Sequence, residues 1–306
     1  MFLVRSSTFS SRASPGFVCQ VALGTIAIFV AYNALIAMVR PQLTPSSDAG
    51  LRNRVIAERY LDGSVPRAAI AGSSLAFRLS PDFLEIDELG SDIYDLAFGG
   101  GSAATGLEVI LRRDKLPQIV FVELNIGYRG SDPALLDEVV AEPRQTMRRY
   151  LPAFRLENRP VDLVVASLAN GLRSLRRPPE GADEPDPVDF GKRLAATLAE
   201  MSAVSDTQKS AVELGFGRLQ ELIDRVHERN VRVILMQLPV DPAVQRSPME
   251  VYTRAQARSR FPEVRYEWWA IPEQEAYRTD DGQHLTRASG RRLARVLRSF
   301  VDEQSR

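Results

Sequence analysis

The sequence predicts an α/β domain with a five-stranded parallel sheet, preceded by one transmembrane helix. Short runs of almost entirely apolar residues alternate with helical segments, and the polar candidates for chemistry follow the ends of these runs. Strands that are apolar along their whole length are typical of a parallel sheet covered by helices on both faces. A long apolar stretch near the amino terminus predicts the membrane helix.

The apolar stretch covers residues 17–39 and contains no charged side chain. As a helix it would be about 35 Å long, which exceeds the roughly 30 Å hydrocarbon core of a bilayer. A cleaved signal peptide has a shorter apolar region, of about 7–15 residues, followed by a site of small residues. Neither feature is present, so an uncleaved signal anchor is favoured over a cleaved signal. A buried core helix is the alternative, but the stretch lacks a polar stripe.

Charges on the two sides of the span predict its orientation. Two arginines and the amino terminus precede it with no acidic residue among them, whereas the arginines that follow are accompanied by Asp48. By the positive-inside rule this small bias favours a cytoplasmic tail, residues 1–16, and an exported main domain. We therefore expect a single-pass protein of the inner (cytoplasmic) membrane with its main domain on the periplasmic side.

The rest of the chain reads as a linker with a short helix at 51–61, together residues 40–66, and one domain over residues 67–306. Five apolar runs predict the strands: Ala68–Ala71, Ile93–Phe98, Gln118–Leu124, Val231–Leu238 and Val264–Ile271. One helix is expected after the glycine cluster at 99–101 and ends at about Leu111. Two more are expected over Asp206–Asn230 and from behind His284 to the end of the chain. An unusually long insertion, 128–205, contains a proline-rich and acidic run at 177–187 that predicts a mobile loop.

Composition excludes several classes of function. Lys+Arg and Asp+Glu both number 39, so no net charge favours nucleic acid. The single cysteine, Cys19, excludes an internal disulfide and a cysteine-rich metal site. A metal site at Asp280, Asp281 and His284 would lack further histidine or cysteine ligands. The glycine cluster at 99–101 does not fit the G-x-G-x-x-G pattern of a dinucleotide-binding site. We expect neither a metal nor a cofactor.

The candidates for chemistry follow the predicted strands at their carboxyl ends, where ligands bind in open parallel sheets. Ser74 lies in a turn of small residues after the first strand, and Asp281 and His284 follow the fifth. The only other histidine, His227, lies near a helix end, where a solvated or dipole-complementing role is favoured. Serine, acid and imidazole in this order are the parts of a Ser-His-Asp hydrolase.

Neighbouring residues compete for two of these roles. Ser73 is the rival of Ser74, and a Gly-Ser-Ser turn is by itself also common as a connection between strand and helix. We expect Ser73 to hydrogen-bond within the turn. Asp280 competes with Asp281, but Asp281 and His284 are three positions apart in a tight turn, which lets this carboxylate accept from Nδ1. Asp280 is expected to be solvated, and Thr286 to cap the last helix.

These motifs resemble the conserved blocks of the SGNH (GDSL-type) hydrolase superfamily, which are G-D-S-L, a glycine block, G-x-N-D and D-x-x-H. Gly72-Ser73-Ser74-Leu75 matches the first block with serine in place of aspartate, and Asp281-Gly282-Gln283-His284 matches the last. Phe98-Gly99-Gly100-Gly101-Ser102 stands where the glycine block belongs. The third block departs from the pattern, because Glu123-Leu124-Asn125-Ile126-Gly127 carries an asparagine without G-x-N-D.

The resemblance, which covers about residues 67–306, implies a flavodoxin-like three-layer α/β/α domain. It also implies a catalytic triad of Ser74, His284 and Asp281. The oxyanion hole would consist of the backbone amides of Ser74 and Gly100, with Asn125 as a third donor.

The G-S-S form of the first block behind a membrane anchor is similar to one subset of the superfamily. That subset includes the D-alanylation protein of teichoic acid synthesis and the alginate O-acetylation proteins. They act outside the cytoplasmic membrane on acyl groups of envelope polymers, often beside a membrane-bound O-acyltransferase. The resemblance therefore implies a serine esterase or O-acyltransferase whose substrate is an acylated envelope polysaccharide. The alternative is a non-catalytic accessory protein of a membrane-bound O-acyltransferase, which the irregular third block favours.

Overall fold

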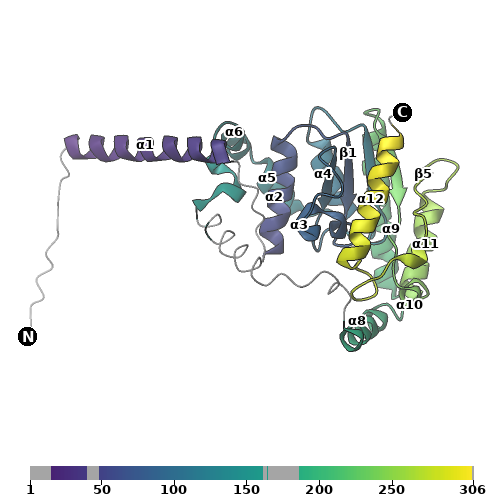
Figure 1. The fold of residues 1–306 in the computed structure, drawn as a ribbon. Helices are drawn as coiled ribbons and strands as arrows, with labels where there is room; N and C mark the ends of the chain where they lie inside the picture. Colours follow the sequence, from purple (N-terminus) through teal and green to yellow (C-terminus); the bar gives the residue numbers. More distant parts are fainter. Residues whose placement is uncertain (1–14, 40–47, 161–163, 165–185, 305–306) are drawn as a thin grey trace, which may run out of the picture.

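The computed structural model describes residues 15–39, 48–160, 164 and 186–304. Figure 1 shows a long helix, α1 (Pro15–Val39), that projects from an α/β domain. This helix is long and apolar enough to cross a membrane, and only 6% of its most apolar part is buried inside the protein. The alternative of a buried core helix is therefore wrong. Length and composition of this kind are shared by membrane anchors and signal sequences.

The domain is built on one sheet of five parallel strands in the order β2-β1-β3-β4-β5. The strands are β1 (Ala68–Gly72), β2 (Ile93–Ala97), β3 (Ile119–Glu123), β4 (Arg232–Met236) and β5 (Glu267–Trp268). Each lies at the position predicted from its apolar run. The fifth is much shorter than predicted, because Val264 is 97% exposed and the amides of Arg265 and Tyr266 donate to Pro262 in a turn. Only the middle of that run, Glu267–Trp268, pairs with β4.

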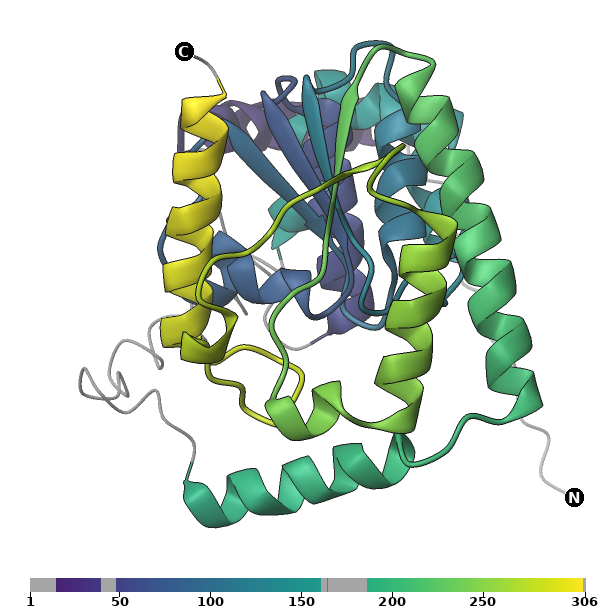
Figure 2. The same ribbon diagram turned by 90° about the vertical axis from the view of Figure 1, so that its right-hand side faces the viewer.

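Helices cover both faces of the sheet. Figure 2 shows α9 (Asp206–His227) and α12 (Arg287–Glu303) on opposite sides of it. On the first side α4 (Ala103–Leu111) approaches β1 so closely that a Cβ at Gly106 would lie 2.9 Å from Ala71 Cβ. On the other side Phe300 of α12 packs against Phe121 of β3 with ring centroids 6.0 Å apart. The core is therefore formed where apolar strands meet the apolar sides of these helices.

Side-chain caps explain where several helices begin. Thr286 accepts a hydrogen bond from the Ser289 amide and caps α12, as predicted. A capping box of Ser205 and Gln208 begins α9. The helix predicted at 51–61 is present as α2 (Ala49–Asp62), and its side chains pack against β2.

The remaining helices connect these layers. They are η1 (Ala76–Leu79), α3 (Pro81–Leu84), α10 (Pro242–Gln245), α11 (Pro248–Arg260) and η4 (Gln274–Ala276). The insertion supplies α5 (Pro133–Val140), α6 (Glu142–Tyr150), η2 (Pro152–Phe154), η3 (Leu156–Asn158) and α8 (Pro187–Glu200). Most of the loop predicted at 177–187 lies outside the described residues.

The strand order determines where a ligand can bind. Because β1 pairs with both β2 and β3, the chain moves to one side of β1 after the first strand and to the other side after the second. In open parallel sheets such a reversal leaves a crevice at the carboxyl ends of the strands. Ser74 follows the end of β1 at this reversal.

Candidate active site

Ser74, His284 and Asp281 form one hydrogen-bonded chain at the carboxyl edge of the sheet. His284 Nε2 lies 3.0 Å from Ser74 Oγ, and His284 Nδ1 lies 2.7 Å from Asp281 Oδ2. The histidine and aspartate side chains are 24% and 26% exposed, so the site is open to solvent on one side. The structure thus brings together the three residues predicted as a triad, although Ser74 and His284 are 210 positions apart.

The turn after β1 decides which of its two serines is accessible. Ser73 is fully buried, and its hydroxyl accepts a hydrogen bond from the Leu75 amide at 3.2 Å. Ser74 is half-buried and faces the histidine. A Cβ at Gly72 would lie 2.4 Å from Ala76 Cβ, so the turn needs glycine there. Ser73 therefore holds the turn, as predicted, and Ser74 is presented by it.

Glu123, at the end of β3, holds this turn in place by a hydrogen bond. It is 1% exposed, and both of its carboxylate oxygens accept backbone hydrogen bonds. Oε2 accepts from the Ser73 amide at 2.9 Å, and Oε1 accepts from the Ile126 amide at 3.1 Å. The sequence analysis gave Glu123 no role. The signal was an acidic residue at the end of an otherwise apolar strand, where a buried charge needs donors.

Hydrogen bonds keep Asp281 ionised. Burial by itself would raise its pKa, but donation from the His284 ring and from the His284 and Gln283 amides holds the pKa of Asp281 well below its usual range. Oδ1 accepts both amides while Oδ2 accepts from the ring. The carboxylate can therefore orient the imidazole and stabilise its positive charge.

Asp280 is not solvated, contrary to the sequence-based expectation. Its Oδ2 lies 2.9 Å from Arg78 Nη1, and both side chains are mostly buried. The Asp280 amide donates to the His284 carbonyl, and this pairing turns the Asp280 side chain toward η1. Burial raises the pKa of Asp280, and Arg78 partly offsets this. The ion pair therefore connects the loop that carries Asp280, Asp281 and His284, here called the acid–histidine loop, to η1, the helix that follows the Ser74 turn.

The insertion also contacts the acid–histidine loop. Thr197 of α8 donates its hydroxyl to the Asp281 carbonyl at 2.9 Å. Gly282 has φ +95°, a conformation that glycine adopts readily, and a Cβ there would lie 2.7 Å from Leu194 of α8. The sequence analysis did not find this support, because no motif links residues of the insertion to the loop.

The glycine cluster predicted for the oxyanion hole forms a tight turn after β2. Gly100 has φ +76° and is exposed, and the Gly101 amide donates to Phe98 across the turn. Asn53 of α2 fixes the turn by two hydrogen bonds, donating to the Gly99 carbonyl at 2.9 Å and accepting from its amide at 3.1 Å. Asn53 is a further residue that sequence analysis missed.

The backbone amides of Ser74 and Gly100 are free donors. Within the described part of the chain, neither amide has a hydrogen-bond partner. Free backbone N–H groups at a serine turn and at a neighbouring glycine turn are the donor type that an oxyanion hole uses.

Asn125 is held differently from the two backbone amides. Its side chain is 4% exposed, donates to the Leu238 carbonyl at 3.0 Å and accepts from the Leu238 amide at 2.7 Å. This pairing joins the loops after β3 and β4. It occupies the amide oxygen and one of the two amide hydrogens, so only the second hydrogen remains for a third oxyanion contact.

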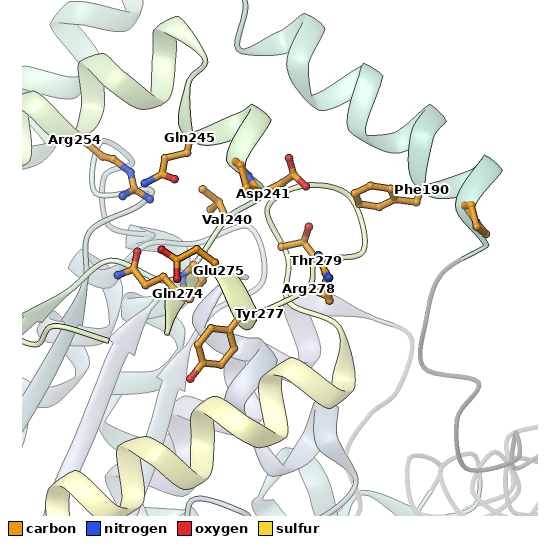
Figure 3. A pocket seen from close by; sticks show the side chains of 13 residues that line it. Phe190, Val240, Asp241, Gln245, Arg254, Gln274, Glu275, Tyr277, Arg278 and Thr279 are labelled. Atoms are coloured by element: carbon orange, nitrogen blue, oxygen red, sulfur yellow. The ribbon is translucent and has the colours of Figure 1, made fainter. Parts of the chain in front are cut away.

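A cavity of about 320 Å³ adjoins the acid–histidine loop on the side of α8. Figure 3 shows Phe190 projecting from α8 toward the loops that carry Asp241 and Thr279. The Asp241 amide, beside this cavity, donates to the Gly282 carbonyl at 2.8 Å and so joins the loop after β4 to the loop that carries Asp281 and His284. None of the three triad residues lines this cavity.

His227 ends α9, just before β4 begins, and therefore lies at the opposite edge of the sheet from the triad. It is exposed, as predicted for a histidine without a chemical role. Among the described residues, no group of three or more histidine, cysteine, aspartate or glutamate side chains is arranged to hold a metal ion.

Comparison of the chain with protein-family models, with curated proteins and with solved structures finds no match. A serine hydroxyl beside an imidazole that an ionised carboxylate orients is the arrangement of an activated oxygen nucleophile.

Proposed function

We propose that this chain is a membrane-anchored serine esterase or O-acyltransferase of the SGNH type. The observation that carries the proposal is the continuous chain from Ser74 Oγ through both imidazole nitrogens to Asp281, with distances of 3.0 Å and 2.7 Å. A serine, a histidine and an aspartate that merely lie near one another do not use both ring nitrogens. This arrangement does, and it lies at the strand reversal where a ligand is expected.

The strand order supports assignment to a flavodoxin-like fold. Order 2-1-3-4-5 in a fully parallel sheet is that of flavodoxin-like doubly wound domains, and helices cover both faces here as well. The motifs that resemble the SGNH blocks then lie after β1, β2, β3 and β5 at the same edge. The irregular third block is the element that departs from the superfamily.

In the proposed reaction, His284 Nε2 removes the hydroxyl proton of Ser74 while Ser74 Oγ attacks the carbonyl carbon of an ester. The negative charge of the tetrahedral intermediate is stabilised by the amides of Ser74 and Gly100, and Asn125 has one hydrogen left to contribute. The ester C–O bond then breaks, and His284 returns the proton to the leaving alcohol. The acyl group remains on Ser74 as an ester.

A second half-reaction releases the acyl group. His284 removes a proton from an incoming hydroxyl, whose oxygen attacks the acyl-enzyme, and the proton passes to Ser74 as its oxygen leaves. Water as acceptor gives net ester hydrolysis, and a sugar hydroxyl gives acyl transfer. Neither route needs a metal or a cofactor, because the charge is stabilised by backbone amides.

The substrate class is inferred from location and resemblance. With α1 as an uncleaved anchor and a periplasmic domain, acylated polymers of the envelope lie within reach of the site. We therefore propose an acylated envelope polysaccharide as substrate and a membrane-bound O-acyltransferase as partner. A reporter that is active only after export, fused at the carboxyl end, should be active. Activity of a cytoplasmic reporter at that position would contradict the orientation.

One observation favours a second candidate, a non-catalytic accessory protein of a membrane-bound O-acyltransferase. The third block lacks G-x-N-D, and the side-chain oxygen and one amide hydrogen of Asn125 are engaged in hydrogen bonds with Leu238. Such a domain would keep the fold of an esterase while failing to stabilise an oxyanion. Reactivity of Ser74 separates the two candidates, because an accessory domain has no need of an activated nucleophile.

The experiment is labelling of the full chain, extracted in mild detergent, with a fluorophosphonate probe. The esterase proposal expects stoichiometric labelling that Ser74→Ala abolishes and Ser73→Ala leaves in place. Hydrolysis of p-nitrophenyl acetate should follow the same pattern. An unlabelled wild-type chain with an intact circular dichroism spectrum would support the accessory protein instead.

A further inference from the structure

The carboxyl-terminal half of α1 is joined to the insertion by hydrogen bonds of two of its side chains, Tyr32 and Asn33. Asn33 Oδ1 accepts a hydrogen bond from the Ala153 amide at 3.0 Å. The hydroxyl of the preceding residue, Tyr32, donates to the Asn158 carbonyl. These bonds hold η2 and η3 against α1, so this part of the insertion lies beside the helix that we assign to the membrane.

The length of α1 places these contacts at membrane depth. A bilayer core of roughly 30 Å needs about 20 helical residues, and residues 5–14, directly before Pro15, are mostly polar. Counted from Pro15, such a span extends to about Ala34. Phe29, which packs against Phe154 with ring centroids 5.6 Å apart, lies within this span. The turn that carries Phe154 therefore reaches the boundary between hydrocarbon and headgroups.

The surface next to this turn has the composition of an interfacial helix. Met147 and Tyr150 of α6 are 45% and 75% exposed, and Phe154 is 45% exposed. Arg144 and Arg149 are exposed on the same helix. Aromatic rings with a polar tip and long basic side chains beside apolar ones are typical of helices that lie in the headgroup region.

Buried ion pairs determine which side of α6 faces outward. Arg148 is 2% exposed, lies 3.1 Å from Glu58 and 3.4 Å from Asp62 of α2, and donates to the Val139 carbonyl. These contacts fix α6 on α2. Because Arg148 points inward, its neighbours Met147 and Arg149 are left on the outside. The exposed surface is therefore rigidly mounted on the α/β domain.

We infer that Arg144, Met147, Arg149, Tyr150 and Phe154 form an interfacial patch that contacts the phospholipid leaflet from which α1 emerges. The apolar side chains would enter the upper acyl region, and the arginines would pair with lipid phosphates. The patch continues the lipid-facing surface of α1 through the Phe29–Phe154 contact, and Figure 1 shows α6 at the carboxyl-terminal end of that helix. The inference rests on the proposed anchoring by α1. With two contacts, the domain would be held at a fixed height above the bilayer.

The test places one environment-sensitive fluorophore at a time on the full chain in nanodiscs of phosphatidylethanolamine and phosphatidylglycerol. Cys19→Ser removes the only native thiol, and Tyr150→Cys then carries the label in the patch. Met147→Cys repeats the measurement in case the first variant folds poorly. Ile28→Cys reports on α1, where the side chain is 73% exposed, and Leu214→Cys on α9, where it is 75% exposed, serves as the aqueous control.

The patch predicts a blue-shifted emission and quenching by nitroxide-bearing lipids at positions 28, 147 and 150, with neither effect at 214. Lipid contact at 28 together with aqueous signals at 147 and 150 would overturn the patch while leaving the anchor in place. An aqueous signal at 28 would overturn both, since the patch depends on the anchor. Quenching at 214 as well would also overturn the patch, because lipid contact would then extend over the whole domain.

Discussion

The Glu123 carboxylate accepts a hydrogen bond from the Ser73 amide at 2.9 Å, so a buried acid on β3 holds the turn that presents Ser74. The same side chain holds the loop after β3 through Ile126. Two loops from neighbouring strands are therefore fixed by one residue that does not touch the histidine. The position of Ser74 therefore depends on Glu123 as well as on the turn itself.

Replacing Glu123 should damage both stability and activity. In Glu123→Gln one oxygen is lost as an acceptor, which leaves a buried amide N–H unsatisfied and places the new NH₂ group against a donor. We expect a loss of about 1–3 kcal/mol in the free energy of unfolding, measured by urea denaturation. Glu221→Gln, on the exposed surface of α9, is the matched control and should be neutral. Equal stability of the two variants would show that the brace is unimportant.

The two serines of the turn should separate chemistry from structure. Ser74→Ala should abolish probe labelling and lower ester hydrolysis by several orders of magnitude without unfolding the domain. Ser73→Ala removes an acceptor of the Leu75 amide, so it should cost about 1 kcal/mol of stability while labelling persists. Labelling and thermal melting measured on the same preparations check both statements. Loss of labelling in Ser73→Ala alone would reverse the assignment of the nucleophile.

The positions of the strands were predictable because each is a short apolar run bounded by turn residues. A run of this length and composition is typical of a strand that is buried on both faces of a sheet. The fifth strand was predicted too long, since the exposure of Val264 depends on a turn at Pro262 rather than on composition. Ser74, Asp281 and His284 were predictable because a serine, an acid and a histidine form an unusual combination. Each part also belongs to a short motif, Gly72-Ser73-Ser74-Leu75 at one end of the domain and Asp281-Gly282-Gln283-His284 at the other.

The supporting residues were not predictable in the same way. Asn53 and Gly99 are 46 positions apart, and Thr197 and Asp281 are 84 apart, so nothing in either local sequence indicates the pairing. Asp280 was expected in solvent because the neighbouring Asp281 already pairs with His284. The partner of Asp280, Arg78, is brought close to it only when the chain folds. Tertiary hydrogen bonds of this kind leave no periodic or motif-like signal.

Substitutions in the acid–histidine loop should form a graded series. His284→Ala should be as damaging to hydrolysis as Ser74→Ala, because residues that act as one unit do not contribute additively. Asp281→Asn should cost less than His284→Ala, since the imidazole remains. Asp280→Asn should cost least, acting through the Arg78 pair on loop position rather than on the ring. Steady-state kcat/KM for the series checks this order, with the exposed His227→Ala expected to be silent.

Asp281 should also make stability depend on pH. Its pKa is lowered in the folded chain, so the unfolded chain binds the proton more tightly. The resulting stabilisation is fully present above the ordinary aspartate pKa of about 3.9 and is lost as the pH falls through the lower folded pKa. Asp281→Asn should therefore be less stable than wild type at pH 7, with the difference shrinking below about pH 4. Urea denaturation across this pH range tests the sign, and a difference that grows on acidification would contradict it.

Asn53 should act as a positioning residue for the oxyanion turn. Asn53→Ala removes both hydrogen bonds to Gly99 and releases the turn that carries the Gly100 amide. Because misplacing a transition-state donor affects the chemical step more than substrate binding, kcat should fall by up to roughly 100-fold with little change in KM. Arg54→Gln, which alters the next residue of α2 and its pair with Glu138, controls for general effects on that helix. Should both variants lose activity equally, or should KM rise while kcat holds, the turn would not depend on Asn53 for its catalytic position.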